Sequence, residues 1–335
     1  MRRKRFLSAA AAALAWPAPA RATGGLDVET AESIHPMRVL LASGSAAPPE
    51  RIDEWHFAWD GRQYRGTFDV VRLPDGSDGL VNTLPLDSYL YGVLAKEVSP
   101  SWPAAAQQAQ AIVSRAYALG KLRPEKPYDL VASESDQQYS GITGESVQGR
   151  AAIDATGGIV LTYAGAPAHV AYSACCGGRT ADAGDVWNTP YPYLRSVVDP
   201  NCAGSPPYDW EALVPVRSIE EAFPDCGSLG TLRSVELTVL DTGDRPKGMS
   251  LVGTSSTFAT TPKALRASLG PAVMRSTFVR TATIDDGGAS LALTGTGRGH
   301  GVGMCQWGAR ALGEQGSSAA QILAFYLPGT EFGRA

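Results

Sequence analysis

A single acidic residue, Glu97, lies where two apolar segments of the sequence meet. The segment LPLDSYLYGVLAKEVSPSWPAAAQQAQAIVSRAYALGKL (84–122) predicts two helices separated by a Ser-Pro-Ser-Trp-Pro turn. Two leucines and Glu97 follow the spacing i, i+4, i+7, so Glu97 ends an apolar helical face. Burial disfavours the charged form of a carboxyl group and raises its pKa, which suits a general acid at neutral pH. The same spacing also fits a helix-end glutamate that is solvated or pairs with Lys96 or Arg115.

The regions on either side of these helices predict a β-rich framework. Residues 37–83 contain several stretches that alternate apolar and polar residues, separated by turn signals. GGIVLTYAGAPAHVAYSA (157–174) has the pattern of a β-hairpin. Further strands are expected at 234–241 and 248–253, and further helices at 262–269 and in two pieces within 308–329. We therefore expect an α+β fold, with a mixed β-sheet core and a helical segment that carries Glu97, built as one unit or two lobes.

The N-terminus, MRRKRFLSAAAAALAWPAPARA, has the plan of a secretory signal peptide at 1–22, with a basic start, a short apolar run and an Ala-x-Ala end. The apolar run is too short to span a membrane as a stable helix, and no later segment predicts an integral membrane helix. Cleavage after Ala22 would remove five of the 29 basic residues and none of the 33 acidic ones, changing the net charge from −4 to −9. We expect an exported protein, in the periplasm or the extracellular cell-wall space. The sequence contains no stripe of basic residues of the kind that would indicate a nucleic-acid partner.

Five cysteines must then be interpreted in an oxidising compartment. They lie at positions 175, 176, 202, 226 and 305. An odd count indicates one or two disulfides with a thiol left over. A metal site is the alternative, because His169 precedes Cys175 by six residues and His300 precedes Cys305 by five. Neither spacing matches the CxxC pairs of zinc modules.

The segment around Glu97 and several later blocks resemble the stage II sporulation protein D (SpoIID) family, also called LytB or amidase-enhancer. The segment matches the family pattern LPL-acid-x-YL-x-GV-x-x-E, a following WP, and a helix ending in Arg-x-Tyr. The likeness continues in the same order through SDQQYSG (135–141), ATGGIVLTY (155–163), AHVAYSACCGGRT (168–180), VWNTPYPYLRSVVDPNC (186–202), LRASLG (265–270), GRGHGVGMCQWGARALGEQG (297–316) and YLPGTEF (326–332). It implies a SpoIID-like domain at 37–332, preceded by a linker at 23–36 and followed by a tail at 333–335.

The resemblance implies lytic transglycosylase chemistry on peptidoglycan, on glycan strands from which an amidase has removed the stem peptides. The family's catalytic glutamate falls on Glu97. The arginine of its second helix falls on Arg115, which would bind the sugar or tune Glu97. A glycosidase that uses water needs two carboxyl groups. A lytic transglycosylase instead uses the 6-hydroxyl of the muramyl sugar and leaves a 1,6-anhydro end, so one glutamate can serve first as acid and then as base.

The resemblance also gives further substrate-groove candidates at Gln138, Tyr139, His300 and Gln306. Gln138 and Tyr139 match their family block loosely and could instead cap a loop. His300 lies among glycines that permit positive φ and close backbone approach. It could orient Glu97 or touch sugar; alternatively, the loop packs a core turn and His300 bonds to backbone carbonyls.

Some members of the family carry a zinc site built from histidine and cysteine near the CGG segment. Here His169, Cys175 and Cys176 occupy that neighbourhood, although the family spacing does not transfer cleanly. A disulfide between Cys176 and Cys202 is the preferred pairing. The resemblance implies no required cofactor, with zinc as an option.

Three functions are compatible with these residues. The first is a lytic transglycosylase that acts on glycan strands with Glu97 as acid and base. The second is a non-catalytic glycan-binding module that enhances a cell-wall amidase, an N-acetylmuramoyl-L-alanine amidase. The third, a metal- or thiol-dependent hydrolase, lacks a recognisable triad or ligand set. The presence of Glu97 at the turn between the two helices favours the lytic transglycosylase.

Overall fold

The structure is a computed structural model that describes residues 36–44, 48–285 and 288–335. The expected signal peptide and nearly all of the expected linker lie outside the described residues. Within those ranges, no helix combines the length and the apolar character needed to cross a bilayer.

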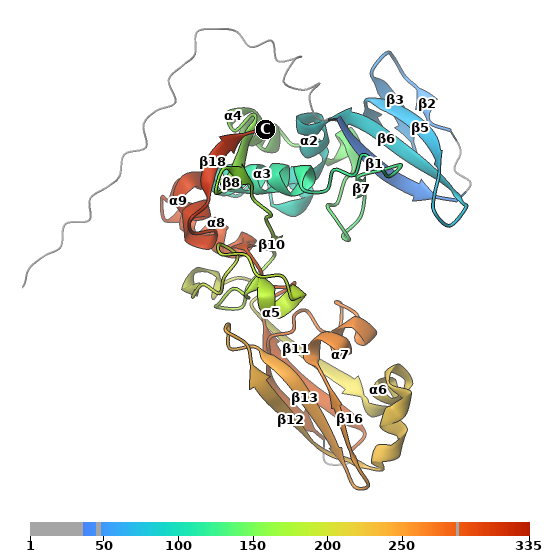
Figure 1. Cartoon of the computed structure of the whole chain (residues 1–335), viewed down its shortest axis with the longest axis vertical. Coiled ribbons are helices and arrows are strands. Elements are labelled where there is room, and N and C mark those ends of the chain that lie inside the picture. Colours follow the sequence, from blue (N-terminus) through green and yellow to red (C-terminus); the bar gives the residue numbers. More distant parts are fainter. Residues whose placement is uncertain (1–35, 45–47, 286–287) are drawn as a thin grey trace, which may run out of the picture.

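The N-terminal part is built from two small sheets (Figure 1). One has the strand order β5-β6-β1-β7, with β7 parallel to β1, and the other has the order β2-β3-β4. Asp60 and Gly61 both have positive φ, as the tight turn between β3 and β4 requires. The strands are β1 (Pro36–Ser43), β2 (Glu50–Arg51), β3 (His56–Trp59), β4 (Arg62–Arg65), β5 (Thr67–Arg72), β6 (Asp78–Pro85) and β7 (Leu130–Val131).

A helical layer packs around the alanine-rich helix α3, which contacts α2, α4, α8, α9 and β8. Opposite faces of α3 belong to different cores: Ile112 and Ala116 pack toward β8 and α9, whereas Ala111 and Ala118 pack toward α2. Its small side chains allow these neighbours to approach from several sides. The elements are α2 (Leu86–Glu97), α3 (Ala104–Leu119), η1 (Gly141–Gly144), α4 (Val147–Ala155), α8 (Gln306–Glu314) and α9 (Ala319–Tyr326), with the sheet β18 (Glu331–Arg334), β8 (Ile159–Tyr163) and β9 (Ala166–Pro167).

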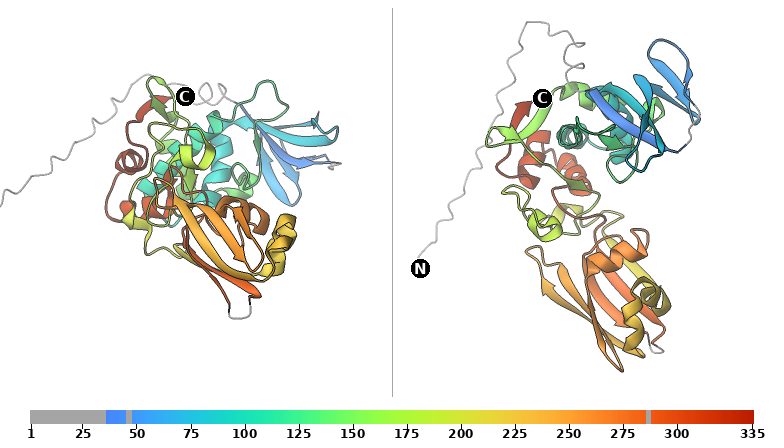
Figure 2. Two further views of the ribbon diagram at one scale, coloured as in Figure 1. Left: turned by 60° about the horizontal axis from the view of Figure 1, so that its bottom comes forward. Right: turned by 45° about the vertical axis from the view of Figure 1, so that its right-hand side comes forward.

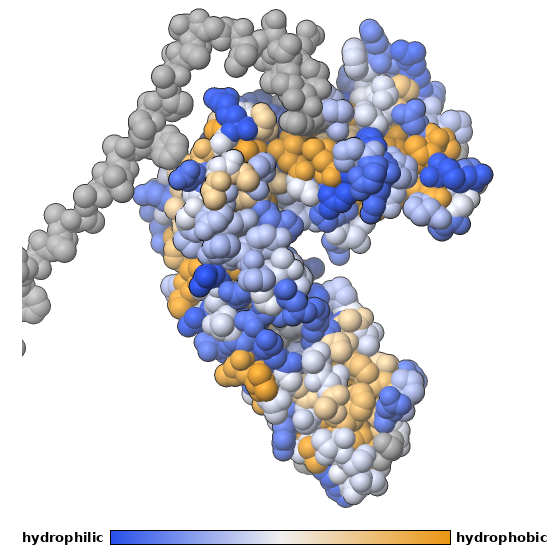
Figure 3. Space-filling view, in the orientation of Figure 1, coloured by the Kyte–Doolittle hydropathy of each residue, from blue (hydrophilic) through white to orange (hydrophobic). Residues whose placement is uncertain are grey.

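Residues 209–296 form a separate lobe with its own hydrophobic core (Figures 1 and 2). The chain enters and leaves it at one point, where Gly297 N donates to Tyr208 O over 2.6 Å. On the face shown in Figure 3, the surface is hollowed between this lobe and the N-terminal part. The lobe contains the sheet β11 (Asp209–Pro215), β16 (Ser290–Thr296) and β15 (Val279–Ile284), the sheet β12 (Leu232–Leu240), β13 (Pro246–Gly253) and β14 (Thr257–Thr260), and α6 (Val216–Ala222), η3 (Pro224–Leu229) and α7 (Pro262–Leu269).

Short elements join the lobe to the helical layer. The parallel pair β10 (Tyr172–Ser173) and β17 (Met304–Cys305) brings together two segments that are distant in sequence. Beside them lie α5 (Ala183–Trp187) and the 3₁₀ helix η2 (Pro200–Cys202). In Figure 1, β10 lies on the side of the helical layer that is nearest the lobe.

The α+β class is confirmed, and so are the two helices of 84–122, the β8–β9 hairpin and the helix at 262–269. The start of α2 has no side-chain cap, and Pro85 occupies the N-cap position. Asp87, which resembles a capping residue, lies instead in the first turn and accepts a hydrogen bond from Arg115.

Candidate active site

Glu97 is the last residue of α2 and is surrounded by hydrogen-bond donors from three other segments. Gln306 Nε2, at the start of α8, donates to Glu97 Oε2 over 3.3 Å. The hydroxyl of Tyr172, in β10, and the backbone N–H of Gln138 also bond to the carboxyl group. The Glu97 side chain is partly buried. The carboxyl group is therefore held in place from several directions and does not extend freely into solvent.

Burial raises the pKa of the Glu97 carboxyl above its ordinary value. The hydrogen bonds from Gln306, Tyr172 and the Gln138 backbone oppose this rise, because they stabilise the carboxylate. The negative charge of Glu134 acts in the same direction as burial. Desolvation is the largest of these effects, so the net shift of the Glu97 pKa is upward, toward the range in which a carboxyl group can act as a general acid.

Two chains of side-chain hydrogen bonds support the groups that contact Glu97. In the first, Tyr89 Oη donates to Gln137 Oε1, and Gln137 Nε2 donates to the Tyr172 hydroxyl. That leaves the Tyr172 proton free to point at Glu97. In the second chain, the Gln306 amide also donates to Gln110 Oε1, and the Gln110 amide donates to Ser114 Oγ. Both chains are anchored on α2 and α3, so the helix pair fixes the orientation of the donors.

The turn between α2 and α3 and the glycine-rich loop position these groups. Gln107 donates to the backbone carbonyls of Pro100 and Trp102, which holds the turn after Glu97. In the loop, all four glycines of GRGHGVG have positive φ. A Cβ at Gly303 would lie 2.0 Å from Ala171 O, so only glycine permits the pairing of β17 with β10. That pairing places Tyr172 and Gln306 beside the same carboxyl group.

Partly exposed aromatic rings flank the site. Trp102 follows the turn after Glu97, and Trp307 follows Gln306; their ring centroids are 5.1 Å apart in a nearly edge-on arrangement. The Arg310 guanidinium lies 4.8 Å from the centroid of Trp307. The faces of such rings offer flat apolar surfaces to a ligand, and the indole N–H offers a hydrogen-bond donor.

Comparisons with known proteins identify the family. The family model described as "SpoIID: Stage II sporulation protein" matches residues 75–163. An uncharacterized protein of Brachyspira hyodysenteriae is 30% identical over 278 residues, which cover 82% of this chain and 73% of that protein. The chain belongs to the SpoIID family.

Two further relatives carry descriptive names. An "Amidase enhancer" of Bacillus subtilis is 28% identical and is matched over 81% of this chain, but over only 44% of its own length. A "Stage II sporulation protein D" of Bacillus amyloliquefaciens is 26% identical, with 77% of each chain covered. Membership in the SpoIID family supports a role connected with the cell wall.

Of the residues that the SpoIID resemblance gives as substrate contacts, Gln306 touches Glu97 directly. Gln138 contacts Glu97 through its backbone N–H, while its side chain donates to Glu134 Oε1 over 2.9 Å. His300 does not reach the carboxyl group by any hydrogen bond in the structure; its Nδ1 accepts from Val302 N. Gln306 and the Gln138 backbone thus contact the Glu97 carboxyl group, whereas His300 does not.

The His300 ring forms hydrogen bonds with backbone groups, which is one of the alternatives that the sequence left open. Because Nδ1 accepts from Val302 N, the ring can donate from Nε2, and it bonds to the backbone of Tyr172. Burial lowers the pKa of His300 to about 4. The ring is therefore neutral at ordinary pH and supports Tyr172, which in turn bonds to Glu97.

Two expected contacts, Arg115 and Tyr139, must be corrected. Arg115 is 1% exposed; its Nε donates to Asp87 over 2.8 Å, and its terminal nitrogens donate to backbone carbonyls at the end of α4 and the start of β8. Tyr139 is also buried, and its hydroxyl donates to Asn82 Oδ1. Both side chains are enclosed by protein on all sides, so neither can touch a substrate.

The sequence alone did not indicate Tyr172, Gln137 or Gln110 as parts of the site. Gln137 directly precedes the expected Gln138. It is the Gln137 side chain that faces inward and bonds to Tyr172, whereas Gln138 contributes its backbone N–H. Tyr172 lies in a strand of two residues, where alternation cannot show which face is functional. Glutamines at 107 and 110 in an otherwise apolar helix were the available signal in the sequence, because amides that such a helix buries need specific partners.

The arrangement of the cysteines also differs from the prediction. Cys176 is grouped with Asp199, Cys202 and Cys305, and this group contains neither His169 nor Cys175. The His169 ring stacks on Tyr191 instead, with centroids 4.9 Å apart. The expected pair, Cys176 and Cys202, is adjacent but not bonded: the sulfur atoms are 3.5 Å apart and both thiols are free.

Proposed function

We propose that this chain is a lytic transglycosylase that cleaves the bond between MurNAc and GlcNAc in peptidoglycan glycan strands. The observation that carries the proposal is the environment of Glu97, a partly buried carboxyl group with a raised pKa and a fixed orientation. Such a group can donate a proton to a leaving oxygen near neutral pH.

In the proposed reaction, protonated Glu97 donates its proton to the glycosidic oxygen, and the bond from that oxygen to C1 of the muramyl sugar breaks. The resulting Glu97 carboxylate then accepts the proton of the muramyl 6-hydroxyl, whose oxygen bonds to C1. The product is a 1,6-anhydro end, and Glu97 is protonated again. Tyr172 and Gln306 stabilise the carboxylate between the two steps, because both donate hydrogen bonds to it.

Substrate binding is proposed along the surface next to Glu97. Trp102 and Trp307 supply flat rings on which sugars could stack. The hollow between the lobe and the N-terminal part offers room for a long strand (Figure 3). We expect the preferred substrate to be glycan without stem peptides, and we expect the protein to act after export, in the periplasm or the cell-wall space.

An alternative function is favoured by the name of one relative. The Bacillus subtilis protein is called an amidase enhancer. In this alternative, the chain binds glycan and increases the turnover of an N-acetylmuramoyl-L-alanine amidase without breaking a bond itself.

Incubation of purified protein with sacculi, either intact or treated with an amidase, separates the two functions. A transglycosylase should release fragments with anhydro-muramyl ends, more from the amidase-treated sacculi, and Glu97→Gln should lower their rate of release on the order of 10² to 10⁴-fold. Trp307→Ala should chiefly raise KM. Faster amidase turnover that is equal for wild type and Glu97→Gln, with no anhydro ends, would favour the enhancer.

A further inference from the structure

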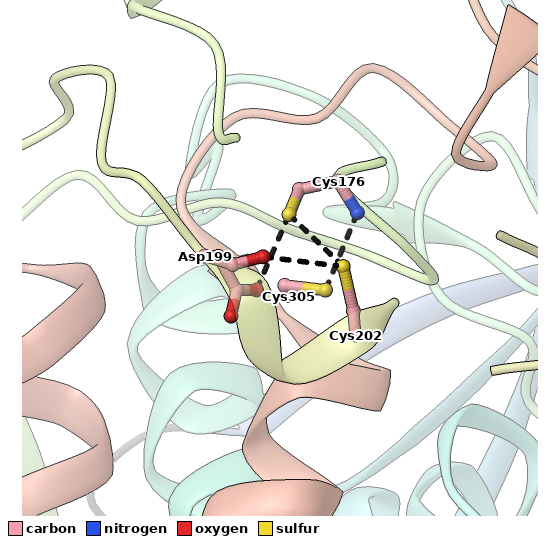
Figure 4. A group of neighbouring side chains, drawn as sticks. All are labelled: Cys176, Asp199, Cys202 and Cys305. Atoms are coloured by element: carbon pink, nitrogen blue, oxygen red, sulfur yellow. Dashed lines mark hydrogen bonds between the residues drawn. The ribbon is translucent and has the colours of Figure 1, made fainter. Parts of the chain in front are cut away.

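Four buried side chains outside the candidate active site converge on one point (Figure 4). They come from three segments: the CCGG loop, the region of η2, and the junction of β17 with α8. One ligand atom from each side chain lies within 4.8 Å of every other. All four residues are 0% exposed: Cys176, Asp199, Cys202 and Cys305.

We propose that these four side chains bind one divalent, thiol-preferring metal ion, with zinc as the expected ion. Zinc takes thiolate sulfur at about 2.3 Å and carboxylate oxygen at about 2.0–2.2 Å in a tetrahedron, which places two sulfur ligands about 3.8 Å apart and a sulfur and an oxygen about 3.5 Å apart. Cys176 Sγ lies 3.5 Å from Cys202 Sγ and 3.2 Å from Asp199 Oδ2. A small expansion of this group would accommodate the ion.

The surroundings of the group are built to hold anionic ligands. The backbone N–H groups of Cys176 and Gly308 both donate to Cys305 Sγ, over 3.3 and 3.4 Å. Asp199 Oδ2 accepts from the Tyr326 hydroxyl, and Oδ1 accepts from Asn201. Such outer hydrogen bonds orient metal ligands and stabilise their deprotonated forms.

A nearby cation offsets part of the remaining negative charge. Three thiolates and one carboxylate carry four negative charges, and a divalent ion neutralises two of them. The guanidinium of Arg245 is 3% exposed and donates from Nη2 to the carbonyl oxygen of Cys176 over 2.6 Å. Its other terminal nitrogen, Nη1, is buried and has no hydrogen-bond partner within the described part of the chain. A buried positive charge in this position favours an anionic centre over a neutral group of thiols.

The metal would be structural, because protein side chains supply four ligands and none of them is exposed. It would join the three segments next to the candidate active site. Cys305 immediately precedes Gln306, so the ion would fix the start of α8. The proposal does not depend on the transglycosylase function, since metal content is measured without any substrate.

The test measures the metal content of the purified full-length chain, prepared without chelator. We expect about one zinc ion per chain by elemental analysis. Cys202→Ser and Asp199→Asn should lose most of it. Cys226→Ser is the matched control, because Cys226 is also buried but belongs to the core of the separate lobe; this variant should keep the ion. Cys175 forms hydrogen bonds with Cys202 and Cys305 but does not belong to the group of four, so Cys175→Ser should also keep most of the ion.

Thiol counting on the wild-type protein keeps the test valid if a variant fails to fold. With the ion bound, denatured protein treated with chelator should show five free thiols, one for each cysteine in the sequence. Cobalt exchanged for zinc should give the visible spectrum of a tetrahedral thiolate site. A metal-free wild-type protein with a Cys176–Cys202 disulfide would overturn the proposal. Loss of zinc in Cys175→Ser but not in Asp199→Asn would overturn the ligand set.

Discussion

At the scale of single residues, the proposed chemistry depends on the opposing effects that the surroundings of Glu97 have on its pKa. Burial and the charge of Glu134 raise the pKa of Glu97, whereas hydrogen bonds from Tyr172, Gln306 and the Gln138 backbone lower it. The net effect raises the pKa of Glu97 above its ordinary value, while hydrogen-bond donors stay in place for the carboxylate. The pKa of Glu97 should therefore set the alkaline limit of activity, above which the acid is deprotonated.

Two substitutions should move this alkaline limit in opposite directions. Tyr172→Phe removes a donor to the carboxylate, so the pKa of Glu97 should rise and the limit should move to higher pH. Glu134→Gln removes a nearby negative charge, so the limit should move to lower pH. The measurement is kcat/KM for release of anhydro ends as a function of pH. Shifts of the same sign in both variants would show that another group sets the limit.

Arg115 should behave as a structural residue. Arg115→Met keeps much of the side-chain volume but leaves Asp87 and two backbone carbonyls without their donor. Breaking such a pair should lower the free energy of unfolding by about 3 kcal/mol, measured by urea denaturation. Adding Asp87→Asn should recover part of the loss, because the unpaired charge is then gone. Unchanged stability with lost glycan binding would instead support the substrate role.

Single residues were predictable from the sequence only where a motif fixed their place. Glu97 and Gln306 lie within motifs that the family resemblance supplies, and the structure brings them into contact. Arg115 lies in the same motif, yet it is buried. A helical pattern cannot distinguish a polar residue that faces substrate from one that satisfies carbonyls inside the core.

At the scale of elements, the candidate site depends on the parallel pair of β10 and β17. Each of these strands has two residues, too few for an alternating pattern to be detected in the sequence. Longer elements, such as α2, α3, α7 and β12, were predicted because their periodicity extends over several turns or several residue pairs.

Gly303→Ala should disrupt this strand pair. Gly303 has φ +75°, and its Cβ would clash with Ala171 O at 2.0 Å, so both strain and collision are expected. The free energy of unfolding should fall by more than the roughly 1–3 kcal/mol that a left-handed conformation costs a non-glycine residue. Gly316→Ala is the control, since Gly316 has φ +89° but no atom within 4 Å. Equal losses in thermal or urea unfolding would refute the role of close approach.

At the scale of the whole molecule, residues 209–296 leave and rejoin the chain at one point, and their core is separate. The sequence alone did not decide between one unit and two lobes, because no linker of distinctive composition marks either end of residues 209–296. Hydrogen bonds from Arg245 to the carbonyls of Cys176 and Arg179 tie this lobe to the CCGG loop. The proposed metal site, which includes Cys176, therefore lies beside this junction.

The most direct test of the central claim is digestion of peptide-stripped glycan in water labelled with oxygen-18, followed by mass spectrometry of the new ends. If Glu97 directs attack by the muramyl 6-hydroxyl, every new muramyl end should be anhydro and free of the label, and Glu97→Gln should release such ends far more slowly. Labelled reducing ends in the wild-type digest would show that water is the nucleophile and would contradict the account.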